Sequence, residues 1–180
     1  QADFKSHRIS VISESEIILS IMKQRALTQS INTSNSAIRN EFQILPTMRD
    51  VIDYSLDKRS TLVALFRGDP MAADACDAHP YLLRAAKYHG ETTERKCPVC
   101  RKTGLTELRY AYGDQLGQYS GRIKNIFELK EMQSEFGEFR VYQVEICQDC
   151  GWNHLIKSFS LGDGKTRKPP RKVKTIEDES

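Results

Sequence analysis

The chain has 180 residues, enough for one compact domain with extensions, and its 39% hydrophobic and 28% charged residues are typical of a somewhat polar globular protein. It contains no apolar run of about 18 residues and no recognisable signal peptide, so we expect a cytoplasmic protein without a membrane span. The formal charge is +3, but residues 165–180 hold six basic and three acidic side chains, so the remainder is neutral and lacks the basic character of proteins held mainly by phosphates.

Residues 1–46 are rich in Ser, Asn, Thr and Gln and are expected to form an extension with one helix. Ser13 and Glu16 have the spacing of a capping box, and apolar residues follow at helical spacing as far as Met22. The polar residues 30–36 are typical of a linker. The helix is therefore expected either to pack on the body of the protein or to reach a partner.

A helical unit is expected over residues 47–92. Thr47 and Asp50 have capping-box spacing, which predicts a helix that begins near residue 47 or 48. Four apolar residues at helical spacing predict a stripe that is buried along this helix: Ile52, Leu56, Val63 and Phe66.

Two shorter helices are expected next. Pro70 can open a short helix that runs through Cys76, and Pro80 a helix over residues 81–89 with Gly90 as its C-cap; His79 and His89 flank this last helix as possible caps. Three helices with a short turn between the last two resemble a helix-turn-helix outline, in which Arg84 and Lys87 would be candidates for contact with DNA. An ordinary packing unit is the alternative.

Residues 93–162 have the character of a β unit. Short runs of apolar and aromatic residues predict paired strands over residues 105–112 and 139–146. Between them, residues 113–122 are expected to form a loop and residues 127–136 a short helix.

Residues 163–180 are rich in Gly, Pro and basic residues and are expected to form a disordered basic tail with an acidic tip. The basic side chains of this tail are candidates for contact with a partner or a nucleic acid: Lys165, Arg167, Lys168, Arg171, Lys172 and Lys174.

Two C-x2-C pairs, Cys97 with Cys100 and Cys147 with Cys150, are the most specific motif in the chain. Each pair can place two sulfur atoms on one ion in a tight turn, and two pairs complete a tetrahedron with metal–sulfur distances of about 2.3 Å. Gly151 follows the last cysteine and favours the closing of that turn. The motif predicts one structural Zn²⁺, with iron as the alternative, and four protein thiolates leave no coordination position for catalysis.

The predicted fold class is therefore α+β, with N-terminal helices followed by a small antiparallel zinc-ribbon β unit and flexible extensions at both ends. A redox dithiol is the alternative for either cysteine pair, but neither pair opens a helix after a strand, which is the context that lowers a thiol pKa.

Three other residues invite a choice between a structural and a functional role. Cys76 lies among alanines and is expected to be a small core residue. Trp152 is expected either to pack over the metal turns or to contact a partner. His154 is expected to be a strand residue beside those turns, a replacement ligand or a further candidate for contact with a partner. No motif of a known enzyme class is present in the sequence, so we expect the chain not to be an enzyme.

Several short stretches between residues 48 and 162 resemble those of a known family. They are Val-Ile-Asp-Tyr at 51–54, His-Pro-Tyr-Leu-Leu-Arg-Ala-Ala at 79–86, Cys-Pro-Val-Cys at 97–100, Tyr-Gly-Asp at 112–114 with Gly117, Gly-Glu-Phe at 137–139, and Cys-Gly-Trp-Asn-His-Leu at 150–155. The family is an actinobacterial one of unknown function with a zinc-ribbon-like pair of cysteine turns. The resemblance implies a cytoplasmic, actinobacterial protein and supplies no activity.

The function expected from these features is that of a non-catalytic zinc-ribbon accessory protein that docks on the transcription machinery, on RNA polymerase, on DNA or on both. The neutral body and the flexible ends favour this reading. A ribosome-associated or RNA-binding factor is the first alternative, because basic tails thread between RNA phosphates. A helix-turn-helix regulator of DNA is the second, and no small-molecule substrate or membrane contact is expected.

Overall fold

The computed structural model describes residues 45, 48–166 and 168. The helix and linker predicted within residues 1–44 lie outside this part of the chain. Leu45, assigned above to the N-terminal extension, is buried against the apolar residues that surround Leu129. Leu45 is therefore part of the core rather than of a separate extension.

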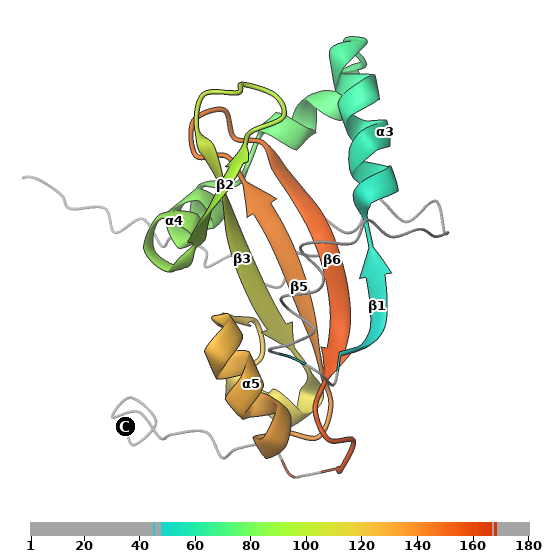
Figure 1. Ribbon diagram of the computed structural model, residues 1–180, viewed down its shortest axis with the longest axis vertical. Coiled ribbons are helices and arrows are strands. Elements are labelled where there is room, and N and C mark those ends of the chain that lie inside the picture. The colour runs from blue at the N-terminus through green and yellow to red at the C-terminus, as the bar shows by residue number, and fades with distance from the viewer. Residues whose placement is uncertain (1–44, 46–47, 167, 169–180) are drawn as a thin grey trace, which may run out of the picture.

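A single antiparallel sheet organises the described residues (Figure 1). Its strands are β1 (Arg49–Asp53), β2 (Glu91–Lys96), β3 (Gly104–Tyr112), β4 (Arg122–Ile123), β5 (Phe139–Ile146) and β6 (Asn153–Leu161). They lie in the order β1-β6-β5-β3-β2, and the short β4 pairs with β3. The two strands predicted from the sequence are β3 and β5, which pair from Thr106 with Ile146 to Tyr112 with Arg140. The predicted α+β class with an antiparallel sheet is confirmed.

Three α-helices and two 3₁₀ helices accompany the sheet in the described residues. They are α3 (Ser55–Phe66), α4 (Pro80–His89), α5 (Ile126–Glu135), η1 (Pro70–Cys76) and η2 (Asp114–Tyr119). The α4 helix begins as predicted, with Pro80 in its first turn and Nδ1 of His79 accepting a hydrogen bond from the backbone N–H of Tyr81 (3.3 Å). The region predicted to be a loop between β3 and α5 contains η2 and β4.

The two faces of the sheet carry separate cores because alternate residues of a strand point to opposite sides. On one face, Leu82 and Ala86 of α4 pack with Leu108 of β3 and its neighbours. On the other face, Leu129 of α5 packs with Val141 of β5. The sheet is thus covered on both sides, and α4 and α5 are held by different faces.

The helix predicted to begin near residue 47 or 48 begins instead at Ser55. The residues before it form β1 and pair with β6, with Ile52 opposite Ser158. Val51 and Ile52 are β-branched, which suits a strand. The carboxylate of Asp53 accepts a hydrogen bond from the backbone N–H of Ser55 (2.7 Å), so the acidic residue that supports the first turn is Asp53.

The apolar stripe predicted to be buried is exposed to solvent, so that prediction is wrong. The exposed fractions are 45% for Ile52, 51% for Leu56, 43% for Val63 and 63% for Phe66. The α3 helix has no fully buried residue and rests on the body through its other side, where Leu62 and Leu65 pack near the cysteine turns.

The helical unit and the β unit predicted on either side of residue 92 share the same sheet. Strand β1 pairs with β6, and β2 runs across the expected boundary. The α3 helix packs on η1 and β6, whereas α4 packs on β3 from the opposite face. The three helices therefore do not form the compact triplet that a helix-turn-helix requires.

The C-terminal tail leaves the body later than predicted. The backbone N–H of Gly164 donates a hydrogen bond to the carbonyl of Gly137 (2.9 Å). Lys165 and Lys168 are exposed, and the other basic tail residues named above lie outside the described part of the chain. Within the described residues, no helix combines the length and apolar character needed to cross a membrane.

Candidate metal centre

Two β-hairpins bring the cysteine pairs together. Cys97 and Cys100 lie in the turn between β2 and β3, and Cys147 and Cys150 lie in the turn between β5 and β6. Strands β3 and β5 are antiparallel neighbours, so the start of one lies beside the end of the other. Both turns consequently meet at the same end of the sheet, although 46 residues separate the pairs in sequence.

The four sulfur atoms form a compact group. All four lie within 4.8 Å of one another. The Sγ–Sγ distance is 3.6 Å between Cys97 and Cys150 and also 3.6 Å between Cys100 and Cys147. A tetrahedron with metal–sulfur distances of about 2.3 Å has edges of about 3.8 Å, so the sulfur positions fit one tetrahedral ion. All five cysteines of the chain are free thiols, and no disulfide competes for these sulfurs.

The two turns have the same backbone plan. In the first, the N–H of Arg101 donates a hydrogen bond to the carbonyl of Cys97 (3.1 Å); in the second, the N–H of Gly151 donates to the carbonyl of Cys147 (3.1 Å). Arg101 and Gly151 both have positive φ, 58° and 72°. Gly151 was expected in this role from the sequence, but an arginine at the equivalent position was not.

Hydrogen bonds to sulfur make the thiols unequal. Burial raises the pKa of Cys147. Hydrogen bonds from the hydroxyl of Thr103 (3.5 Å from its Sγ) and from the backbone N–H groups of Cys150 and Asp149 lower this pKa by more than burial raises it, so the resulting value is about 7. Burial raises the pKa of Cys97 and of Cys150. The centre therefore holds at least one sulfur that is ready to bind a cation at neutral pH, which is the form a metal requires.

The centre is enclosed by apolar side chains. Cys97 and Cys147 are buried, whereas Cys100 and Cys150 are half-buried. Side chains of α3, η1 and β3 pack around them, among them Leu62, Leu65, Ala75 and Leu105. The centre is therefore only partly accessible to water, on the side of Cys100 and Cys150.

Trp152 and His154 were candidates for contact with a partner, but both are fully buried, which fits the alternative that they pack beside the metal turns. The rings stack at a centroid distance of 5.6 Å. Nδ1 of His154 lies 2.6 Å from the carbonyl of Leu155, and Nε2 lies 3.4 Å from a carboxylate oxygen of Asp57 on α3. These contacts hold His154 in the sheet face, and the four cysteines form the potential ligand group without it.

Buried charges connect the metal centre to α3. The indole N–H of Trp152 donates a hydrogen bond to Oε1 of Glu145 (3.0 Å), and Nζ of Lys58 lies 2.5 Å from the same oxygen. Glu145 is completely buried, and Arg95 of β2 lies 3.5 Å from its other oxygen. These residues come from different elements, so the sequence gives no sign that they meet.

Cys76 lies beside the metal centre, which the sequence did not indicate. It packs in the same cluster as the four cysteines and shares a hydrogen bond with Cys150, and burial raises the pKa of its thiol. The remaining sequence candidates, Arg84 and Lys87, are exposed on α4. The guanidinium of Arg84 lies 5.6 Å from the ring centroid of Tyr81, away from the cysteine turns.

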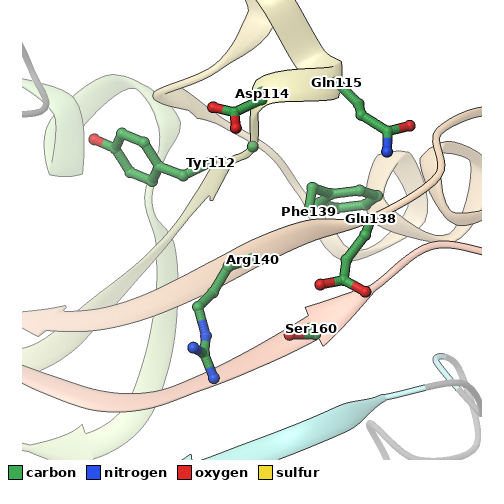
Figure 2. Close-up of a pocket in the computed structure, with 8 residues that line it drawn as sticks. Tyr112, Asp114, Gln115, Glu138, Phe139, Arg140 and Ser160 are labelled. Atoms are coloured by element: carbon green, nitrogen blue, oxygen red, sulfur yellow. The ribbon is translucent and has the colours of Figure 1, made fainter. Parts of the chain in front are cut away.

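A cavity of about 350 Å³ lies at the opposite end of the sheet, where β3 ends and β5 begins (Figure 2). Its charged side chains are Asp114 of η2, Glu138, which immediately precedes β5, and Arg140 of β5. Glu138 lies 3.5 Å from Arg49, and Arg140 donates a hydrogen bond to the carbonyl of Asp50 (3.2 Å). These groups attach β1 to the sheet, and the cysteine centre remains the stronger candidate for function.

Comparison with known proteins gives a family and close relatives. Residues 45–175 match the model of a family of unknown function, DUF5318. Uncharacterized proteins of Mycobacterium bovis and of Mycobacterium tuberculosis are each 44% identical over 120 residues, which is 67% of this chain and 88% of theirs. No solved structure matches the chain.

Proposed function

This chain belongs to the DUF5318 family of unknown function, and we propose that its four cysteines bind one Zn²⁺ whose role is structural. The fit of four sulfurs to one tetrahedron is the observation that carries the proposal. Zinc is the usual ion of such closed four-cysteine turns. Thr103 and the backbone N–H groups around Cys147 stabilise thiolate charge at the centre. The ion would clamp the β2–β3 hairpin to the β5–β6 hairpin.

Elemental analysis of freshly purified, reduced protein tests the metal. We expect one zinc per chain and a colourless solution. One iron per chain, with visible thiolate-to-iron absorption, would show that the metal is iron and not zinc. An absence of any metal in the reduced protein would contradict the proposal.

We infer that the protein is a non-catalytic docking factor. A site filled by four protein thiolates has no open position at which a substrate or water could be activated. In the cavity described above, Glu138 and Arg140 contact Arg49 and Asp50 of β1. A rigid fold held by a metal clamp is suited to presenting a surface to another macromolecule.

The assembly that we propose for this docking is the transcription machinery, with RNA polymerase as the partner. The neutral charge of the chain before residue 165 favours a protein surface over a nucleic acid as the main contact. The basic residues from Lys165 onward favour the second candidate, a ribosome-associated or RNA-binding factor.

Affinity purification of the tagged chain with and without nuclease separates the two candidates. Recovery of polymerase subunits after nuclease treatment is expected. Recovery of ribosomal subunits alone, or complete loss of recovered protein after nuclease, would contradict the polymerase assignment and support the second candidate. A chain truncated after Asp163 serves as the control for contacts made by the basic tail.

A further inference from the structure

The outer side of α3 is an apolar surface that is exposed in the described part of the chain. Leu56, Val63 and Phe66 are spaced by seven and three residues, which places them on one side of the helix, and all three are exposed. The inner side already holds the helix, through Leu62 and Leu65 against the metal-centre cluster and through Lys58 against Glu145. Within the described residues, these three side chains thus have the spacing of a buried stripe but are not buried.

The same outer side is positively charged. Arg59 and Arg67 lie four residues before and four residues after Val63, so both guanidinium groups share the face of the apolar residues. Both arginines are exposed. The acidic residue of the helix, Asp57, lies on the inner side near His154. The outer side of α3 therefore combines three apolar side chains with two cations and no carboxylate.

The strand before α3 extends this surface. Val51 and Ile52 of β1 are also exposed, and α3 continues from the end of β1 at the same edge of the sheet (Figure 1). Among the described residues, β1 is paired with β6 only, so its other edge offers main-chain N–H and C=O groups. Lipid cannot form hydrogen bonds with these groups, so their burial in a membrane would be unfavourable, which argues against a lipid surface as the occupant.

The arginine positions also argue against a second copy of this chain. Two α3 helices that pack antiparallel about Val63 would bring Arg59 of one copy opposite Arg67 of the other. Like charges in such an arrangement repel each other. Complementary charge requires carboxylates, and a planar guanidinium binds a carboxylate through two parallel hydrogen bonds.

We propose that the outer side of α3, defined by Leu56, Arg59, Val63, Phe66 and Arg67, docks an acidic amphipathic helix of a partner protein. Apolar residues of that helix at positions i, i+3, i+4 and i+7 pack on Val63 and Phe66. Aspartate or glutamate residues beside them pair with Arg59 and Arg67. The inference rests on the proposed docking function and specifies the chemistry of the partner.

Selection from a phage-displayed library of helical peptides tests this surface, with the purified, metal-loaded full chain as the target. The enriched peptides are expected to carry Asp or Glu beside Leu, Ile or Phe. Their affinity should fall at least about tenfold with Val63→Asp and with Arg59→Glu/Arg67→Glu. Peptides with lysine in place of the carboxylates should bind the Arg59→Glu/Arg67→Glu chain better than the original chain.

Phe127→Ser is the matched control, because Phe127 is 69% exposed on α5, away from α3. It should leave peptide affinity unchanged. Metal content and circular dichroism confirm that each variant is folded, since the substituted side chains are exposed. The selection needs no polymerase, so a failed affinity purification and a failed peptide selection are separate outcomes.

Four results would overturn the inference. They are failure to enrich any peptide, enrichment of peptides without carboxylates, binding to phosphatidylglycerol vesicles that Val63→Asp abolishes, and a dimer in light scattering that Val63→Asp dissociates. The third result would assign the surface to a membrane, and the fourth would assign it to a second copy of the chain.

Discussion

Arg101 and Gly151 occupy equivalent positions in the two cysteine turns. Each follows the first cysteine of its pair by four residues, donates its N–H to the carbonyl of that cysteine at 3.1 Å, and has a left-handed backbone conformation. Their surroundings differ, because a Cβ added to Gly151 would lie 2.5 Å from the carbonyl oxygen of Cys76. The two turns are alike in hydrogen bonding and unlike in the space around them.

Substitutions at these two positions should therefore have unequal effects. We expect Gly151→Ala to lower the free energy of unfolding by at least about 2 kcal/mol, because it adds both backbone strain and a clash with main chain. Arg101→Gly should change it by less than about 1 kcal/mol, because the relief of strain is offset by a more flexible unfolded chain. Urea denaturation of the metal-loaded protein measures both changes. Equal changes would show that the crowding around Gly151 does not distinguish the two turns.

Serine substitution at any of the four clustered cysteines should remove the metal. Removal of one thiolate opens the coordination shell and weakens a site whose binding energy contributes to folding. Elemental analysis should give far less than one metal per chain for Cys100→Ser. Cys76→Ser is the matched control: it packs beside the centre but is not part of the ligand group, so the metal content should stay at one per chain.

The contact between Lys58 and Glu145 should contribute strongly to the attachment of α3. Glu145 is completely buried, and the Lys58 side chain is 24% exposed, so removal of one partner leaves the other charge without its full compensation. Lys58→Met and Glu145→Gln should each lower the free energy of unfolding by about 2–4 kcal/mol. A double-mutant cycle should show a coupling of about 1–3 kcal/mol.

The partly exposed pair between Lys124, which precedes α5, and Glu128 of α5 serves as the comparison for that cycle. Its Nζ–Oε1 distance is 2.9 Å, but the glutamate side chain is 42% exposed. Lys124→Met should change the free energy of unfolding by less than about 1 kcal/mol, because solvent reaches the carboxylate of Glu128 and screens the pair. Similar effects for Lys58→Met and Lys124→Met would show that burial of Glu145 is unimportant.

Lys157 should make stability depend on pH in the alkaline range. Burial lowers the pKa of Lys157 to about 8, from 10.5 in its usual environment. Between these values the unfolded chain keeps a proton that the folded chain has released, so stability rises with pH above about 8. The rise attributable to Lys157 should be about 2 kcal/mol between pH 7 and 9.5.

Denaturation of metal-loaded protein at several pH values, compared with Lys157→Met, isolates this contribution. The difference in unfolding free energy between the two chains should narrow as the pH rises, because the buried lysine loses its charge. A difference that stays constant across this range would show that Lys157 titrates normally in the fold.

Local sequence determined the elements that depend on neighbouring residues. The C-x2-C spacing, with a glycine after Cys150, indicated the metal turns, because such turns are closed by contacts within a few residues. Short runs of apolar and aromatic residues indicated β3 and β5, and Pro80 with His79 indicated the start of α4. The same reasoning misplaced the start of α3, because β1 forms through pairing with the distant β6.

Burial was decided only by the tertiary structure. Trp152, a possible partner contact in the sequence, is enclosed by the sheet face that carries Glu145, whereas Val63 and Phe66, expected to be buried, face solvent. Helical spacing shows that side chains share one side of a helix, but it does not show what covers that side. That depends on which strands pair across the sheet, because contacts between residues far apart in the chain place α3 with Leu62 and Leu65 inward.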